Sequence, residues 1–121
     1  MTSGPANLRD TAVSGRPLTD AEADLLDGAY AGDLERVKAA LMDGADVNAQ
    51  HPGTGLCALH LAIAADSIDV LRYLVLDKGA AFFPDASGRW PTIVAGAAKA
   101  SVEVADFILE QENRYCQTHG T

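Results

Sequence analysis

The stretch from Gly55 to Gly79 constrains the fold more than any other part of the sequence. Its apolar residues recur three and four positions apart in two groups: Leu59, Ala62 and Ile63, then Val70, Tyr73 and Leu74. This spacing puts each group on one face of a helix. Asp66 and Ser67, between the groups, are residue types that cap a new helix, and Gly79 can supply the left-handed residue that ends it. The stretch therefore predicts two helices packed as a hairpin.

A similar hairpin is predicted upstream. Thr19-Asp-Ala-Glu22 has the pattern of a capping box, in which the Thr19 hydroxyl and the Glu22 carboxylate each accept from the other residue's backbone N–H. We expect this helix to end at Gly32, and Asp33 to cap a second helix that ends at Gly44. The inward-facing residues are Leu25, Leu26 and Ala29 in the first helix and Leu34, Val37 and Leu41 in the second.

A third hairpin is predicted downstream. It opens at Asp85-Ala-Ser-Gly88 and places Pro91 at the first position of a helix, where the missing N–H costs nothing. Ser101 can cap the last helix, whose inner face carries Val104, Phe107 and Ile108. Residues 114–121 have no apolar period, so we expect them to fray. Residues 1–18 are rich in small polar residues, Gly and Pro, which predicts a disordered leader.

Residues 57–62, Cys-Ala-Leu-His-Leu-Ala, resemble the Thr-Pro-Leu-His-x-Ala signature of the ankyrin repeat. Leu59, His60 and Ala62 match the signature. The positions recur at the family's spacing of 33 residues: Gly55, Ala58, Leu59 and Ala62 are followed by Gly88, Pro91, Thr92 and Ala95. Gly44-Ala-Asp-Val-Asn-Ala49 also resembles the segment that joins one ankyrin repeat to the next. The resemblance covers roughly residues 19 to 112.

The resemblance implies an all-α fold, an ankyrin-type solenoid of stacked helix-turn-helix hairpins joined by β-turn finger loops. We expect repeats at about 19–50, 51–83 and 84–113, with the leader before them and the tail after them. The finger at His51-Pro-Gly-Thr-Gly55 should project, because its Pro and Gly residues indicate a tight turn. Residues with structural roles are predicted to be Gly44, Leu59, His60, Gly79 and Pro91.

Composition limits the classes of partner. The formal net charge is −8 and the isoelectric point is about 4.6. Binding to nucleic acid or to an anionic membrane needs a basic patch, so we expect neither. A protein with a basic or mixed surface is the favoured partner. Residues 1–18 contain no apolar run that could serve as a signal or an anchor, so we expect a cytoplasmic protein with reduced cysteines.

The sequence contains little material for catalysis. Cys57 with His60 and Cys116 with His119 form two Cys-x-x-His units, which together could supply a zinc site. The simpler interpretation is that His60 bonds a neighbouring backbone group and that Cys57 replaces the family's threonine, so we expect no metal, no cofactor and no catalytic residue. Two alternatives stay open: a small thiol- or metal-dependent enzyme, and a stabilising subunit of a larger assembly.

Repeat equivalence predicts where a partner binds. It places Tyr30, Ala64 and Ala97 at one surface position and Glu22, Leu56 and Arg89 at another, and the resemblance implies that both line the concave side. We expect an interaction module acting as an adaptor, regulator or neutralising partner. The predicted binding residues are Tyr30, Thr54, Leu56, Ala64, Ser87, Arg89, Trp90 and Ala97. Trp90 alternatively covers the end of the core, and Phe83, which replaces the family's asparagine, either packs under a loop or faces the partner.

Overall fold

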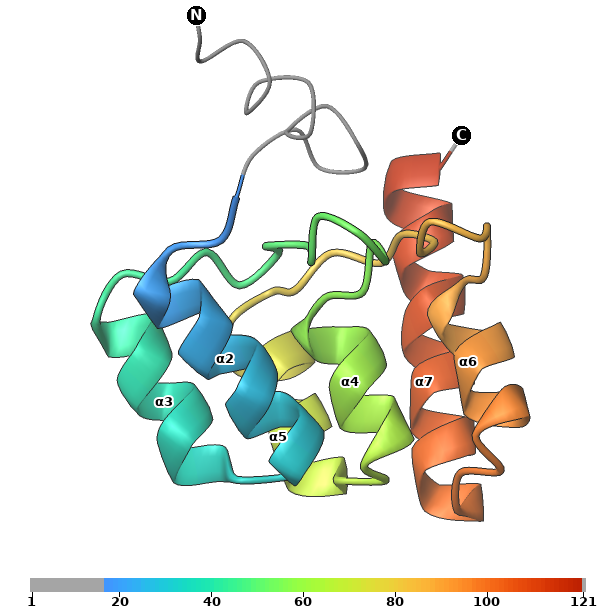
Figure 1. Cartoon of the computed structure of the whole chain (residues 1–121). Coiled ribbons are helices and arrows are strands. Elements are labelled where there is room, and N and C mark those ends of the chain that lie inside the picture. Colours follow the sequence, from blue (N-terminus) through green and yellow to red (C-terminus); the bar gives the residue numbers. More distant parts are fainter. Residues whose placement is uncertain (1–16, 121) are drawn as a thin grey trace, which may run out of the picture.

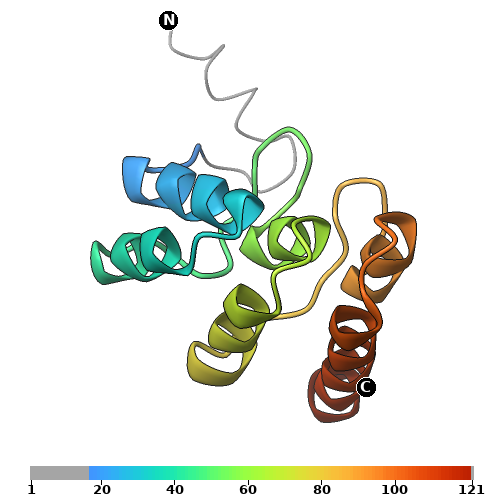
Figure 2. The ribbon, with the colours of Figure 1, turned by 90° about the horizontal axis from the view of Figure 1, so that it is seen from below.

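Paired helices form two layers in the computed structural model, which describes residues 17–120 (Figure 1). The inner layer contains α2, α4 and α6, and the outer layer contains α3, α5 and α7, as the view from below shows (Figure 2). Each inner helix is joined to an outer one by a short turn, which makes three hairpins. The predicted all-α solenoid is confirmed. Almost all of the predicted leader, residues 1–16, lies outside the described residues.

The first hairpin consists of α2 (Asp20–Ala31) and α3 (Leu34–Met42). Its capping box is confirmed: Glu22 N donates to Thr19 Oγ1, and Thr19 N donates to Glu22 Oε1, both at 3.1 Å. Gly32 ends α2 in a left-handed conformation, with φ 69°. Asp33 caps α3 by accepting from Arg36 N at 3.2 Å.

The second hairpin consists of α4 (Ala58–Ala64), α5 (Ile68–Arg72) and a π-helical turn, η1 (Tyr73–Asp77). Ser67 holds the capping position of α5 but makes no side-chain cap bond. Asp66 is left-handed, and its carboxylate accepts from Ser101 N of the third hairpin at 2.8 Å. The prediction that these side chains cap α5 is therefore wrong. The Asp66 carboxylate instead bonds the backbone of the third hairpin. Gly79 is left-handed, as predicted.

The third hairpin consists of α6 (Pro91–Ala97), α7 (Val102–Tyr115) and a final π-helical turn, η2 (Cys116–Gly120). Pro91 stands at the first position of α6, and Ser101 Oγ accepts from Val104 N at 3.3 Å. We expected residues 114–121 to fray, but residues 114–120 are helical. The reason is a contact that local sequence does not show: the Tyr115 ring packs 5.6 Å from that of Phe82, and His119 stacks on Tyr115 at 4.1 Å.

Hydrogen bonds and buried side chains join neighbouring repeats. Asn48 Oδ1 accepts from Ala81 N at 2.8 Å, and Ala86 N donates to Thr54 O at 3.0 Å. Phe83 stands in the later connector at the position that Asn48 holds in the earlier one. Phe83 is half-buried, its ring centroid lies 6.1 Å from that of the buried His60 in an edge-to-face arrangement, and it packs against the hydrophobic core. A single hydrophobic core runs through all three hairpins.

Candidate partner-binding surface

Three left-handed residues give the register of the repeats. Gly32, Asp66 and Lys99 have φ angles of 69°, 57° and 56°. Each donates its N–H to the carbonyl three residues before it, just after an inner helix. Two positions before these residues stand Tyr30, Ala64 and Ala97; five positions before them stand Asp27, Leu61 and Val94; ten positions before them stand Glu22, Leu56 and Arg89. The positions that repeat spacing equates therefore share one register in the structure, although Glu22, unlike Leu56 and Arg89, is buried.

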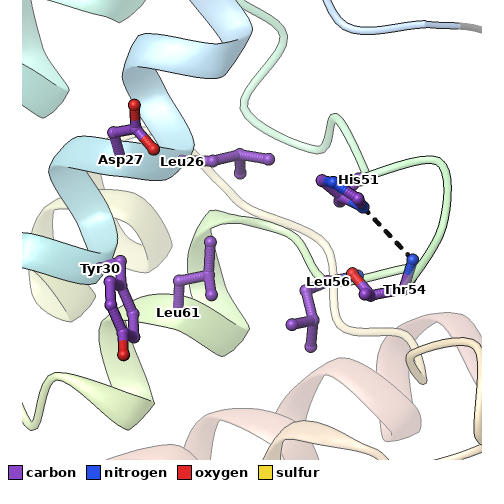
Figure 3. A pocket seen from close by; sticks show the side chains of 7 residues that line it. All are labelled: Leu26, Asp27, Tyr30, His51, Thr54, Leu56 and Leu61. Carbon is purple, nitrogen blue, oxygen red and sulfur yellow. Dashed lines mark hydrogen bonds between the residues drawn. The ribbon is translucent and has the colours of Figure 1, made fainter.

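A hollow of about 290 Å³ lies between α2, α4 and the first finger loop, and we call it the first hollow (Figure 3). Leu61 separates Tyr30 from Leu56 in this view, and the loop residues close the opposite side. The lining is mostly apolar and consists of Leu26, Asp27, Tyr30, His51, Thr54, Leu56 and Leu61. Three predicted binding residues, Tyr30, Thr54 and Leu56, are thus brought together here.

Internal hydrogen bonds hold the first finger loop. His51 Nδ1 accepts from Gly53 N at 3.1 Å and from Thr54 N at 3.3 Å, and Thr54 Oγ1 accepts from Leu56 N at 3.2 Å. Gly55 is left-handed, with φ 72°, and a Cβ there would stand 2.5 Å from Ala86 N of the second finger. The loop can therefore pack on its neighbour only with glycine at position 55.

A second hollow, of about 250 Å³, lies between α4 and α6. Its lining consists of Leu56, His60, Leu61, Ala64, Arg89, Val94, Ala97 and Ala98. Four predicted binding residues line it: Leu56, Ala64, Arg89 and Ala97. Leu56 and Leu61 belong to both hollows, so the two lie next to each other along the inner helices. Because the exposed alanines have short side chains, they leave space here for a partner's side chains.

The second finger is built around a buried carboxylate. The side chain of Asp85 is 2% exposed, and Oδ2 lies 3.1 Å from both Nε and Nη2 of Arg89. Asp85 Oδ1 accepts from the backbone N–H groups of Ser87 and Arg89 and from the Ser87 hydroxyl. Burial alone would raise the pKa of Asp85, but these hydrogen bonds and the guanidinium hold it at about 2. Arg89 therefore has a structural role besides its place in the second hollow.

The remaining predicted positions lie apart from the hollows. Ser87 belongs to the Asp85 cluster and lines neither hollow. Trp90 is 36% exposed at the capping position of α6 and also lines neither. Glu22, expected at the surface, is buried: besides its capping bond, its Oε2 accepts from Asp46 N at 3.2 Å.

Four residues that line the first hollow were missed by the sequence-based prediction: Leu26, Asp27, His51 and Leu61. In the second hollow, His60, Val94 and Ala98 were missed as well. Leu26 was assigned to the core, and it is buried while one side of it borders the first hollow. Leu61 falls outside the apolar stripe of α4. Repeat equivalence was the available signal for Leu61, because Val94 is apolar at the same position. Predicting His51 as a lining residue would have required the geometry of the finger loop, which sequence alone does not provide.

Cys57 and His60 form a buried cap at the start of α4. His60 Nδ1 accepts from Cys57 N at 3.2 Å, and the Cys57 Sγ atom lies at the same distance from Nδ1. The predicted bond from His60 to a neighbouring backbone group is confirmed. Burial lowers the pKa of His60 and raises that of Cys57 to about 11, so both side chains favour their neutral forms.

Cys116 is exposed, whereas Cys57 is buried. Within residues 17–120, no group of three or more His, Cys, Asp or Glu side chains is arranged to hold a metal ion. In the same part of the chain, no helix has the length and apolar character needed to cross a bilayer.

A family model matches most of the chain. The family model described as ankyrin repeats, in three copies, matches residues 25–119. No curated protein matches the chain. The matched range extends over all three hairpins except the first turn of α2 and the last residue of η2, and it includes every residue that lines the two hollows.

Proposed function

Since this chain belongs to the ankyrin-repeat family, we propose that it binds another protein along its inner helices, across the two hollows. Ankyrin repeats indicate a protein–protein interaction module and are in general not catalytic. The observation that carries the proposal is the pair of adjacent, mostly apolar hollows that share Leu56 and Leu61. Tyr30, 65% exposed at the edge of the first hollow, is one of the residue types that are enriched among interface anchors.

Charge favours a partner with a basic or mixed surface. The chain carries a net charge of −8, and Asp20, Asp24 and Asp27 are all exposed on α2. Such a field speeds association with a cationic surface and weakens with salt. An acidic adaptor, regulator or neutralising partner that acts in the cytoplasm fits these properties.

Affinity capture with matched variants tests the proposal. Leu56→Asp places a charge between the two hollows, whereas Leu76→Asp places the same charge on an exposed residue of η1. We expect a bound protein to be retained by the parent chain and by Leu76→Asp and to be lost from Leu56→Asp. Circular dichroism must show that both variants remain folded. Equal retention by all three folded chains would contradict binding through the inner helices.

A second candidate function is that of a subunit of a larger assembly. It is suggested by apolar side chains that are exposed on the third repeat. Ile93, Val102 and Leu109 are 56%, 76% and 48% exposed. The equivalent positions in the first two repeats are buried or half-buried: Leu26, Leu34 and Leu41, and then His60, Ile68 and Val75. Light scattering after size exclusion tests this candidate. A mass above one chain that falls in Val102→Asp would support it, and a monomer at every concentration would contradict it.

A further inference from the structure

The first hollow contains one carboxylate, that of Asp27, in an otherwise mostly apolar lining. The second and third repeats have Leu61 and Val94 at the same position. The first repeat therefore places a negative charge where its neighbours place an apolar side chain. Figure 3 shows Asp27 on α2 beside Leu26 and one turn before Tyr30, at the border of the hollow.

Asp27 differs from the carboxylates that serve the fold. Asp85 is paired with Arg89, Glu22 caps α2, and Asp66 accepts from Ser101 N. Among residues 17–120, by contrast, no donor or cation reaches the Asp27 carboxylate. Lys38 and Lys78 contact Tyr73 on the outer layer instead.

Filling the hollow would change the surroundings of this carboxylate. A side chain seated among Leu26, Leu56 and Leu61 would exclude water from one side of Asp27. Removing water from a charge costs free energy unless the partner provides a compensating donor. An apolar group alone would therefore bind less well than an apolar group that brings a cation with it.

We propose that the first hollow receives one aliphatic or aromatic side chain from a protein segment that carries a lysine or arginine beside it, and that this cation pairs with Asp27. The inference rests on the proposed function and specifies the chemistry of the partner. The anchoring side chain is assigned to the first hollow rather than the second, because the lining of the second hollow contains no carboxylate that could pair with the partner's cation.

A peptide library displayed on phage and selected against the folded chain provides the probe. We expect the enriched peptides to place an apolar residue within two positions of a lysine or arginine. One enriched peptide is then synthesised, and its affinity is measured by calorimetry at low and high salt. The variants are Tyr30→Ala for the wall of the hollow and Asp27→Asn for the charge, and the matched control is Asp106→Asn, an exposed aspartate of α7.

Asp27→Asn should weaken binding about 2- to 5-fold and reduce its salt dependence, as expected for a partly exposed ion pair. Tyr30→Ala should weaken it about 5-fold or more, and Asp106→Asn should leave it unchanged. Enriched peptides without basic residues, or with the same affinity for Asp27→Asn, would overturn the inference, as would a library that yields no peptide.

Mapping by amide chemical shifts separates this failure from a failure of the proposed function. A footprint restricted to the second hollow would reject the anchor site and leave binding along the inner helices standing. A footprint around Leu76 and Arg72 on the outer layer would reject both.

Discussion

At the scale of single residues, two clusters of buried polar groups are held by hydrogen bonds between residues close in sequence. His60 accepts from Cys57 N at the start of α4, and Asp85 collects donors from Ser87 and Arg89 in the second finger. A buried polar group is costly unless it is bonded, so these clusters restrict what each position tolerates. The pKa values of Cys57, His60 and Asp85 are shifted in these clusters, so the reactivity of the thiol and the pH dependence of stability can test them.

The two cysteines should differ sharply in reactivity. The thiolate is the reactive form, and burial raises the pKa of Cys57 to about 11, while Cys116 is exposed. At pH 8 we expect one thiol per folded chain to react quickly with a disulfide reagent and the second only after denaturation. Cys116→Ser should abolish the fast phase. A fast phase that persists in this variant would show that the α4 cap opens readily.

Acid should destabilise the protein partly through Asp85. Its pKa is about 2 in the folded chain against an ordinary value of 3.8, so the unfolded chain takes up the proton first as the pH falls. The stabilisation, about 2 kcal/mol, is therefore fully present above pH 5 and is lost between roughly pH 5 and 2. Urea unfolding at pH 6 and pH 3 measures it, and Asp85→Asn should lose less stability across this range than the parent.

Arg89→Ala provides a companion test of the same cluster. If Arg89 served only as a partner-binding residue, as its predicted role implies, this change would affect binding and leave the melting temperature unchanged. The structure shows that it leaves a buried carboxylate without its guanidinium, so we now expect a lower melting temperature. An unchanged melting temperature would mean that the backbone N–H groups suffice to hold Asp85.

At the scale of elements, the finger loops and connectors join neighbouring repeats in addition to the packing of the helices. Thr54 O accepts from Ala86 N between the two fingers, and Asn48 reaches Ala81 in the next connector. The first contact joins backbone atoms of two fingers, which leaves little space for side chains between them, and the second joins a side chain to the backbone of the next repeat.

Gly55→Ala should therefore disrupt the stacking of the fingers. A Cβ at position 55 would stand 2.5 Å from Ala86 N, whereas one at Gly88, which is also left-handed, would meet nothing within 4 Å. Both substitutions carry the strain of a positive φ, about 1 kcal/mol, so their difference reports the clash. We expect Gly55→Ala to be the more destabilising by at least about 1 kcal/mol in urea unfolding. Equal effects would indicate that the fingers separate at little cost.

At the scale of the whole molecule, three repeats share one core, and the middle repeat contacts both others. Leu59 is 1% exposed at its centre. In a repeat protein each unit is stabilised mainly by its neighbours, so damage to the middle unit weakens both interfaces. The third repeat, by contrast, leaves Ile93, Val102 and Leu109 bare at its end.

Leu59→Ala should cost roughly 2–5 kcal/mol, because it leaves a cavity where the structure cannot fully collapse. The exposed Leu76 provides the control, and Leu76→Ala should change stability by less than about 0.5 kcal/mol. Thermal melts followed by circular dichroism compare the two. A Leu59→Ala melting temperature within a degree or two of the parent would show that the middle of the core lies elsewhere.

The sequence by itself determined the features that depend on residues close together along the chain. The Thr19 capping box, the left-handed Gly32 and Gly79, Pro91 at the start of α6 and the apolar stripes were all predictable, because each arises within one or two helical turns. Repeat spacing extended this local information to the stacking of hairpins, and it also placed Tyr30, Leu56, Ala64 and Ala97 along the hollows.

Only the tertiary structure decided the features that need a distant partner. The buried Glu22 accepts a hydrogen bond from Asp46 N, and Asp66 accepts one from Ser101 N. Phe82 packs against Tyr115, which accounts for the helical end of the chain. The first hollow likewise combines α2, α4 and a finger loop. The side chains that line it depend on how segments far apart in the sequence pack together, and a local pattern of residues carries no information about that packing.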